Sequence, residues 1–361
     1  MKGRIEFLDV LRGVAALAVF ASHLLYPIAI NPQFSDGLGA FVRMISVDYF
    51  NWGRFGVVLF FLLSGFVIPQ SFKGTRPVST FLVGRFFRLY PAYWLSIIWT
   101  VAILFLVFSQ SFPGLQLLAN LTMIQKFLGF QDVNGVYWSL AIEIVFYALC
   151  IALCLAGALE KPLFGFLLFA IFMFATILPI AVNWKIGTRL PIQFFTHHLS
   201  FLFLGGLIRD GIYLRKSSGA MKLAWVGVGL ALIGLPFACG LTGSIPAAQI
   251  AAGQEYAFIA GYVVAISVFV AGVIFKFSAN SFWSWAGAIS YSVYIFHFGA
   301  LKLAEWIFPL HGVASVMAYL LAATSVTLVV AAAVYRYVEL PFMDLGRHVR
   351  RRVDLMPLSS G

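Results

Sequence analysis

Long apolar segments constrain this chain more than any other feature of its sequence. Ten of them approach the roughly 20 residues that an α-helix needs to cross about 30 Å of hydrocarbon. They cover approximately residues 7–30, 55–72, 89–108, 136–159, 163–182, 191–208, 222–242, 256–275, 283–301 and 312–335. Only 10% of the residues are charged and 62% are hydrophobic, whereas about 25% are charged in soluble domains. The sequence therefore predicts an all-α, polytopic membrane protein with about ten transmembrane helices.

The distribution of basic residues predicts the orientation of these segments. Of the 24 Lys and Arg residues, 18 fall on one side of the membrane when the N-terminus is placed inside, and 6 fall on the other. Cytoplasmic loops carry this excess, so both termini are expected in the cytoplasm. The net charge of +11 is too dispersed to form a nucleic-acid surface. We expect one transmembrane domain over residues 1–346 and a short basic cytoplasmic tail over 347–361.

One long connection separates the third and fourth apolar segments. Residues 109–135 contain Pro113, Gly114, Lys126 and Asp132, which are unfavourable in the hydrocarbon region. The sequence predicts a loop with a short interfacial helix here rather than another crossing.

The first apolar segment contains ionisable residues. Arg12 and His23 are eleven positions apart, so on a helix they lie about 16 Å apart along the axis and about 20° apart around it. Arg12 is expected near the cytoplasmic end and His23 in the outer half of the membrane. Because buried ionisable groups in lipid face a bundle interior or a wet cavity, this helix face is a candidate functional surface. An arginine anchor with a packing histidine is the structural alternative.

Two other segments carry ionisable residues at a similar expected depth. Glu143 lies seven residues into a segment that starts outside, and His297 lies fourteen residues into one that starts inside. Both are expected in the outer third, like His23. His197 and His198 begin a segment at the outer surface, where a solvated role is as reasonable as a catalytic one. We therefore discount both as site residues.

A basic cluster occurs on the cytoplasmic side in the stretch GRFFRLYP. Arg85 and Arg88 are three residues apart and therefore share a helix face. With Arg12 and Arg336 they would form a cationic mouth suited to phosphate, because guanidinium groups match phosphate oxygens in charge and geometry. Ordinary anchoring of the helix by positive residues is the alternative.

Several motifs resemble the membrane-bound acyltransferase family 3. They are LRGVAALAVFASH in the first segment, FFLLSGFVI at 60–68, RFFRLYPAYW at 85–94, YWSLAIEIVFY at 137–147, ISYSVYIFH at 289–297 and VYRYVELP at 334–341. The motifs follow the family's order and cover the chain from Ile5 to about Arg347. No hydrolase-like domain of the kind fused to some relatives accompanies them.

The resemblance implies an enzyme that takes an acyl group, often acetyl, from cytoplasmic acyl-coenzyme A and attaches it to a hydroxyl group. The nucleotide phosphates would bind at Arg12, Arg85, Arg88 and Arg336, and the pantetheine arm would run inward along the first helix. The thioester would then reach the region of His23, because the arm is long enough for a gap of about 16 Å.

The chemistry of acyl transfer assigns roles to the remaining polar residues. An alcohol that attacks a thioester needs a base and oxyanion donors. His23 is the expected base or acyl-carrying nucleophile, and the sequence does not separate the two. Glu143 would orient the imidazole or hold the acceptor hydroxyl. Trp138, Ser139, Tyr291 and His297 are weaker candidates for donors or for a sugar-stacking face. No metal-ligand constellation appears.

The leading hypothesis is a membrane O-acyltransferase, most plausibly an O-acetyltransferase of a surface or secreted polysaccharide in the inner membrane of a bacterium. Its expected partners are acyl-coenzyme A, a glycan or other hydroxyl acceptor and the lipid bilayer, with a homo-oligomer as an open possibility. The alternative is a proton-coupled transporter or a lipid or glycan flippase, in which Arg12, His23 and Glu143 form a pathway.

Overall fold

The protein is predominantly helical in the residues that the computed structural model describes, which are 5–34, 36–186, 193–242 and 255–355. No β-strand occurs in these ranges. The chain divides into two compact units. The first combines the chain up to Val67 with Ala156–Ala288, and the second combines Ile68–Leu155 with the chain from Ile289.

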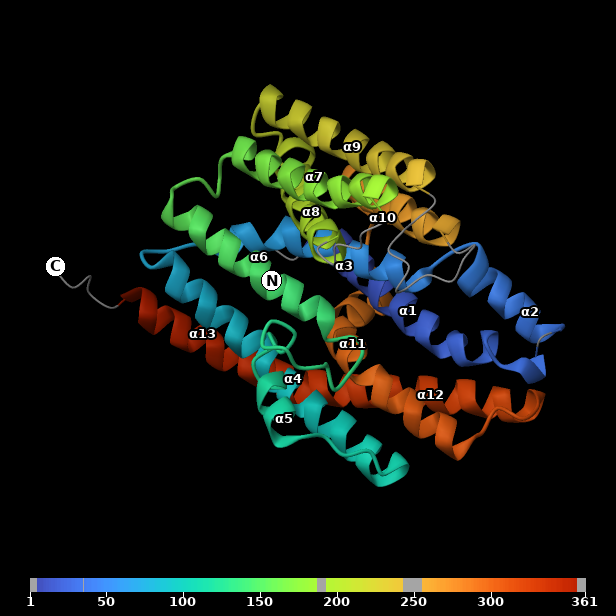
Figure 1. Cartoon of the computed structure of the whole chain (residues 1–361). Coiled ribbons are helices and arrows are strands. Elements are labelled where there is room, and N and C mark those ends of the chain that lie inside the picture. Colours follow the sequence, from blue (N-terminus) through green and yellow to red (C-terminus); the bar gives the residue numbers. More distant parts are fainter. Residues whose placement is uncertain (1–4, 35, 187–192, 243–254, 356–361) are drawn as a thin grey trace. The chain divides into compact units, whose positions relative to one another are not determined.

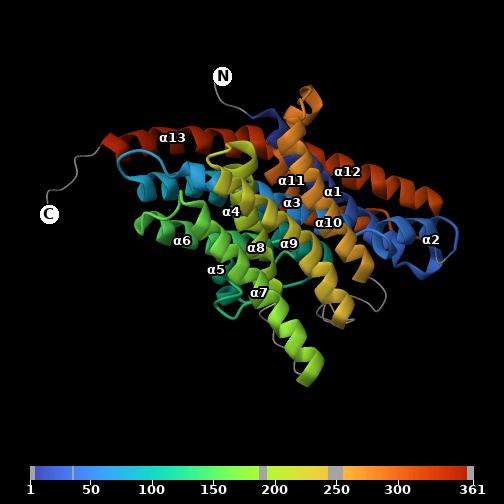
Figure 2. The ribbon, with the colours of Figure 1, turned by 90° about the horizontal axis from the view of Figure 1, so that it is seen from above.

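The first unit is built around one central helix. Its helices are α1 (Glu6–Ala29), α2 (Leu38–Arg43), α3 (Trp52–Val67), α7 (Pro162–Ile186), α8 (Gln193–Ile208), α9 (Ser218–Thr242), α10 (Glu255–Phe275) and the first turns of α11 (Ser281–Ile307). Helix α3 packs against α1, α8 and α10, and α7 lies beside α8 and α9 (Figure 1, Figure 2). Because α3 is surrounded in this way, apolar residues cover nearly all of its surface, as expected of a buried helix.

Two glycines bring α3 and α8 into backbone contact. A Cβ atom at Gly65 would lie 1.7 Å from the carbonyl oxygen of Leu202, and one at Gly205 would lie 2.1 Å from the carbonyl oxygen of Leu62. Small residues permit such close approach between membrane helices. Gly65 belongs to the stretch FFLLSGFVI, so the packing of the first unit accounts for the glycine in that motif.

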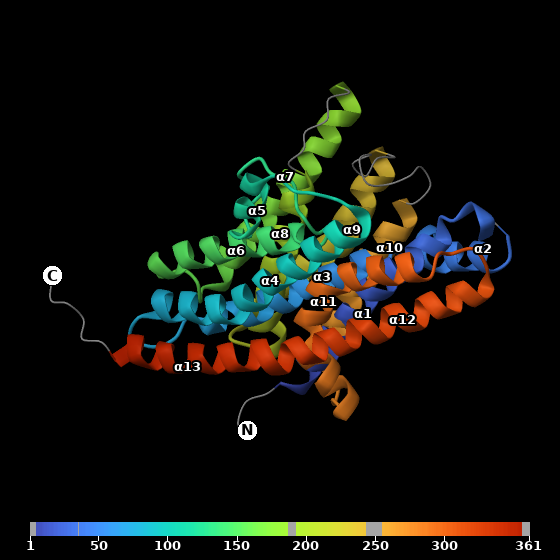
Figure 3. The same ribbon diagram turned by 90° about the horizontal axis from the view of Figure 1, so that it is seen from below.

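The second unit contains the longest described helix, α4 (Pro77–Phe108). Its other helices are α5 (Gly114–Asn120), α6 (Trp138–Leu155), the remainder of α11, α12 (Val313–Val334) and α13 (Leu340–Leu355). A π-helical turn, η5 (Tyr335–Glu339), joins α12 to α13, and Figure 3 shows the two as one nearly continuous rod. Helix α13 lies along α4.

The connection after α4 folds back along that helix. The hydroxyl groups of Tyr90 and Tyr93 donate to the carbonyl oxygens of Thr122 (3.1 Å) and Asn120 (2.6 Å). The side-chain amide of Asn134 donates to the hydroxyl of Thr100 at 3.3 Å. Within the connection, α5 has seven residues and is too short to cross a membrane. The predicted loop with a short helix is confirmed.

Each of the ten predicted apolar segments overlaps a helix, although residues 191 and 192 of the sixth lie outside the described residues. Within the described ranges, six helical segments are long and apolar enough to cross a membrane. The count of ten crossings and the cytoplasmic position of both termini stay predictions. Helix α13 runs through the segment expected to be the tail, as far as Leu355.

Candidate functional site

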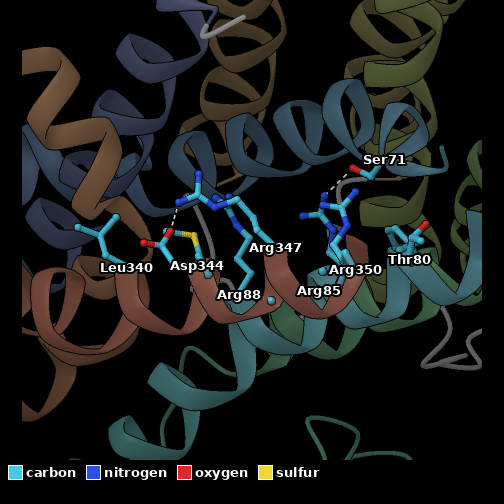
Figure 4. Close-up of a pocket in the computed structure, with 12 residues that line it drawn as sticks. Ser71, Thr80, Arg85, Arg88, Leu340, Asp344, Arg347 and Arg350 are labelled. Atoms are coloured by element: carbon cyan, nitrogen blue, oxygen red, sulfur yellow. Dashed lines mark hydrogen bonds and ion pairs between the residues drawn. The ribbon is translucent and has the colours of Figure 1, made fainter. Parts of the chain in front are cut away.

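A basic pocket lies between α4 and α13 in the second unit. Its volume is about 270 Å³, and four arginines line it: Arg85 and Arg88 from α4, and Arg347 and Arg350 from α13. Figure 4 shows the guanidinium group of Arg85 next to that of Arg350. Asp344 is the only acidic residue among those that line this pocket, so the pocket carries an excess of positive charge.

Helical spacing and glycines place the four arginines together. On both helices the two arginines are three positions apart and therefore share a face. A Cβ atom at Gly346 would lie 2.7 Å from Cβ of Phe87, so this glycine lets α13 approach α4. A Cβ atom at Gly84 would lie 3.2 Å from Cδ of Arg350. Gly84 therefore leaves room for the Arg350 side chain across the helix pair.

Local contacts hold two of these side chains in position. Arg85 donates a hydrogen bond of 2.8 Å from Nη2 to Oγ of Ser71, and Arg347 forms an ion pair with Asp344 (Figure 4). The guanidinium of Arg85 also lies 5.6 Å from the ring centre of Phe81 and 5.8 Å from that of Tyr147. An arginine fixed by aromatic rings and one hydrogen bond can present its remaining N–H groups to an anion.

A chain of polar residues leads from the arginines into the core of the second unit. The hydroxyl of Tyr147 donates a hydrogen bond of 2.7 Å to Oε1 of Glu143. Tyr147 is buried, and it lies within electrostatic range of Arg85 and Arg88. Glu143 is therefore linked to the basic pocket through one side chain.

A second carboxylate, that of Glu339, also lies near the arginines of the pocket. Glu339, only 4% exposed, accepts a hydrogen bond from Oγ of Ser292 and lies within electrostatic range of Arg88. Tyr291 interacts electrostatically with both Glu143 and Glu339. Glu339 ends the π-helical turn η5, and such turns are frequent at functional sites. The second unit thus collects two carboxylates behind its arginines.

The structure shows which part of α4 lies beside Glu143. The expected position of Glu143 in the outer third of the membrane stays a prediction. Tyr137, just before α6, contacts Ser96 of α4 through a hydrogen bond of 2.7 Å. Helix α6 therefore begins beside the middle of α4, and Glu143 lies correspondingly closer to Arg85.

The first unit holds the two polar residues of α1. Arg12 forms an ion pair with Asp9, with 3.7 Å between Nη1 and Oδ1. His23 is exposed, and its Nδ1 lies 3.1 Å from the carbonyl oxygen of Val19. A carbonyl only accepts hydrogen bonds, so this contact assigns the proton to Nδ1. In the neutral imidazole, Nε2 is then the nitrogen with the lone pair.

Other basic and imidazole groups of the first unit lie near His23. Arg54 of α3 interacts electrostatically with both His23 and His197. His197 is buried against the rings of Tyr262 and Phe201, and neither of its ring nitrogens has a hydrogen-bond partner. The sequence left a solvated and a catalytic role equally open for His197, and its burial makes it a core residue.

The weaker candidates occupy structural positions in the second unit. Ser139 shares a hydrogen bond of 2.7 Å with the hydroxyl of Tyr294, and His297 is fully buried with Nδ1 3.0 Å from the carbonyl oxygen of Val293. Trp138 is half-buried at the start of α6. Arg336 is exposed and does not line the basic pocket.

Two residues of the pocket were missed by the sequence analysis. Arg347 and Arg350 were assigned to the expected cytoplasmic tail. Their spacing in LGRHVRRRVDL was the available signal, since two basic residues three positions apart share a helix face in the same way as Arg85 and Arg88. Among the described residues, no group of three or more His, Cys, Asp and Glu side chains is arranged to hold a metal ion.

Comparisons with known proteins identify the family of the chain. A family model described as an acyltransferase domain matches residues 5–336. Acyltransferase MdmB of Streptomyces mycarofaciens is 33% identical over 153 residues, which are 40% of this chain and 38% of that protein. Nodulation protein 10 of Rhizobium leguminosarum bv. viciae is 27% identical over 159 residues, 38% of this chain and 41% of that protein.

The chain therefore matches about two fifths of the length of each of these relatives. No solved structure gives a significant match. The family model covers nearly the whole sequence, including the helices that carry His23, Arg85, Arg88 and Glu143. The protein is a multi-pass membrane protein that belongs to the acyltransferase 3 family.

Proposed function

We propose that this protein is a membrane O-acyltransferase. It moves an acyl group, in the first place acetyl, from acyl-coenzyme A to a hydroxyl group of a glycan. The observation that carries the proposal is the four-arginine pocket of the second unit, together with its link through Tyr147 to Glu143.

The pocket supports the choice of donor. A coenzyme A thioester has a compact, highly charged nucleotide end and a thin, nearly neutral arm. Arg85, Arg88, Arg347 and Arg350 offer several N–H groups in the forked geometry that suits phosphate oxygens. In this proposal the arginines bind the diphosphate, and Arg12 on α1 stays a further candidate for binding the coenzyme.

His23 supplies the proton transfer. With its proton on Nδ1, the imidazole presents a basic Nε2. In the direct mechanism Nε2 takes the proton of the acceptor hydroxyl, whose oxygen forms a bond to the thioester carbonyl carbon. The carbon–sulfur bond then breaks, and the leaving thiolate recovers the proton. In the two-step alternative Nε2 attacks the thioester carbonyl carbon, the carbon–sulfur bond breaks, and the thiolate leaves. The acceptor hydroxyl then attacks the acyl-imidazole, the carbon–nitrogen bond breaks, and the hydroxyl proton goes to the thiolate.

Glu143 has a supporting part in the proposal. Its hydrogen bond from Tyr147 fixes one carboxylate oxygen, and the other oxygen is suited to hold a hydroxyl group of the acceptor. Trp138, Ser139, Tyr291 and His297 stay weaker candidates, because the hydrogen bonds of Ser139 and Tyr291 are used within the fold.

The acceptor and the location are proposed from the family. The matched part of MdmB belongs to a protein named an acyltransferase, and the other relative is named a nodulation protein. We place this chain in the inner membrane of a bacterium, where a surface or secreted polysaccharide offers hydroxyl groups. This assignment makes a bilayer and a glycan its natural partners.

The function is tested by deleting the gene and comparing O-acyl groups on the cell's glycans by mass spectrometry. The expected result is the loss of one O-acyl modification, restored by the wild-type gene but not by His23→Ala. Purified protein should also transfer label from acetyl-coenzyme A to the glycan so identified. Unchanged glycans together with no binding of acetyl-coenzyme A would overturn the proposal and favour a transporter.

A further inference from the structure

A second basic pocket adjoins the first, again within the second unit. Its volume is about 260 Å³, and it shares Thr80, Arg347 and Arg350 with the four-arginine pocket. Lys73 and Arg351 are its own basic residues. The two pockets therefore form one groove along α13, in which Arg347 and Arg350 belong to both halves.

The acidic lining residue of the second pocket, Asp354, is already hydrogen-bonded. Its partner is Thr75, in the segment that precedes α4. Oδ1 of Asp354 accepts hydrogen bonds from the backbone N–H of Thr75 at 2.7 Å and from its hydroxyl at 3.0 Å. The same hydroxyl lies 2.7 Å from the backbone carbonyl oxygen of Asp354. We call this set of contacts the Thr75–Asp354 clasp.

Because the clasp engages Asp354, the second pocket has more basic side chains than acidic groups to neutralise them. In the described part of the chain, neither Lys73 nor Arg351 forms an ion pair, and both are exposed. Four cations thus surround a cavity whose carboxylate is already hydrogen-bonded. The ligand chemistry that fits is a phosphate monoester, which carries about −1.5 to −2 charges at neutral pH.

Coenzyme A has phosphate groups in two places, a diphosphate bridge and a monoester on the 3′ carbon of its ribose. Two adjoining pockets that share two arginines match this division. We propose that the pocket of Lys73, Arg347, Arg350 and Arg351 binds the 3′-phosphate of the acyl donor, and that the enzyme therefore selects acyl-coenzyme A over donors without this phosphate. This inference rests on the proposed function and names the donor's recognition group.

The other source of a phosphate monoester at this position is the headgroup of the anionic lipid phosphatidic acid. Donor recognition is favoured because the two pockets are continuous and coenzyme A would occupy both. A lipid headgroup would occupy only the pocket of Lys73 and Arg351. The experiment below separates the two sources.

The test compares acetyl-coenzyme A with acetyl-dephospho-coenzyme A, which lacks only the 3′-phosphate. The full-length protein is placed in nanodiscs of zwitterionic lipid, and the dissociation constant of each donor is measured. We expect the dephospho donor to bind at least about tenfold more weakly, since charged hydrogen bonds contribute about 1.5–3 kcal/mol and 1.4 kcal/mol is a factor of ten.

The double variant Lys73→Ala/Arg351→Ala provides the second half of a thermodynamic cycle. It should lose about tenfold in affinity for acetyl-coenzyme A and almost nothing for the dephospho donor. Arg352→Ala is the matched control, because this exposed arginine lies on the same helix and lines neither pocket. It should leave both affinities unchanged.

Four outcomes would contradict the proposal or its basis. Equal affinities of the wild type for the two donors, or an equal loss for both in the double variant, would overturn the 3′-phosphate assignment while leaving acyl-coenzyme A as the donor. A discrimination that disappears when anionic lipid is added would assign the pocket to lipid instead and also overturn it. Failure of both donors to bind would reject the proposed function itself.

Discussion

The two units use glycine for different purposes. In the first unit, Gly65 and Gly205 bring α3 and α8 together until backbone touches backbone. In the second unit, Gly346 brings α13 to α4, but Gly84 makes space for the side chain of Arg350, and a basic pocket remains beside it. The first contact is closed and apolar, whereas the second is open and charged. Close packing and ligand binding are thus built from the same residue type at different positions.

A parallel difference concerns the ionisable groups. The first unit holds an exposed imidazole, His23, whose tautomer is set by its own helix. The second unit holds the arginines and the two carboxylates behind them. In the proposed function, the first unit supplies the proton transfer and the second binds the donor. Variants in the two units should therefore change different kinetic constants.

The largest effect is expected from His23. His23→Ala removes the basic nitrogen, and general bases contribute about 10²–10⁴-fold to rate. We expect acyl transfer to fall by at least a hundredfold while the affinity for acetyl-coenzyme A stays within about twofold. Labelled transfer and equilibrium binding with purified protein measure the two quantities. The exposed His348, changed to Ala, is the control, and substantial transfer by His23→Ala would assign the base elsewhere.

The arginines of the second unit should show the opposite behaviour. Arg85→Ala or Arg88→Ala is expected to weaken donor binding by about ten- to a hundredfold, because a charge-assisted contact to phosphate contributes about 1.5–3 kcal/mol. The turnover number at saturating donor should change much less. Lys222→Ala, an exposed cation of the first unit, should bind donor normally. A loss of turnover without a loss of affinity would remove the arginines from the donor site.

The closed contact of the first unit is tested by stability. Gly65→Ala places a methyl group against the backbone of α8, and overpacking of this kind costs about 1–3 kcal/mol. We expect a lower midpoint of thermal unfolding in detergent. Gly229→Ala is the matched control, since nothing lies within 4 Å of a Cβ atom there. Equal midpoints for the two variants would mean that the α3–α8 contact contributes little to stability.

The smallest effect concerns the link behind the pocket. Tyr147→Phe removes the hydrogen bond to Glu143 and keeps the ring beside Arg85. A lost hydrogen bond of this kind costs about 0.5–1.5 kcal/mol, so turnover should fall about two- to tenfold with donor affinity nearly unchanged. Steady-state kinetics provide the measurement, with the exposed Tyr337→Phe as control. An effect on affinity alone would make Tyr147 a wall of the pocket and not a support for Glu143.

Much of the helical fold could be predicted from the sequence, because membrane helices must satisfy their own backbone hydrogen bonds and therefore appear as apolar runs. The pairing of Arg85 with Arg88 was equally accessible, since it depends only on spacing within one helix. These features are local, and local patterns survive in any tertiary arrangement.

The features that were missed depend on contacts between distant segments. Arg347 and Arg350 follow the last apolar run, so they resemble a solvated tail until α13 is seen to lie along α4. The position of Glu143 beside α4 depends on hydrogen bonds from Tyr90 and Tyr93 to the connection that precedes α6. The spacing of Arg347 and Arg350 indicates that they share a helix face, but neither of these contacts between distant segments leaves a periodic signal in the sequence.

The Thr75–Asp354 clasp has a consequence for how the protein is made. It joins residues 279 positions apart, and the two walls of the basic groove come from equally distant segments. A ribosome completes α4 long before α13, so two of the five arginines of the groove, Arg85 and Arg88, are made well before Arg347, Arg350 and Arg351. The complete groove can therefore assemble only at the end of synthesis, once the C-terminal helix has joined α4.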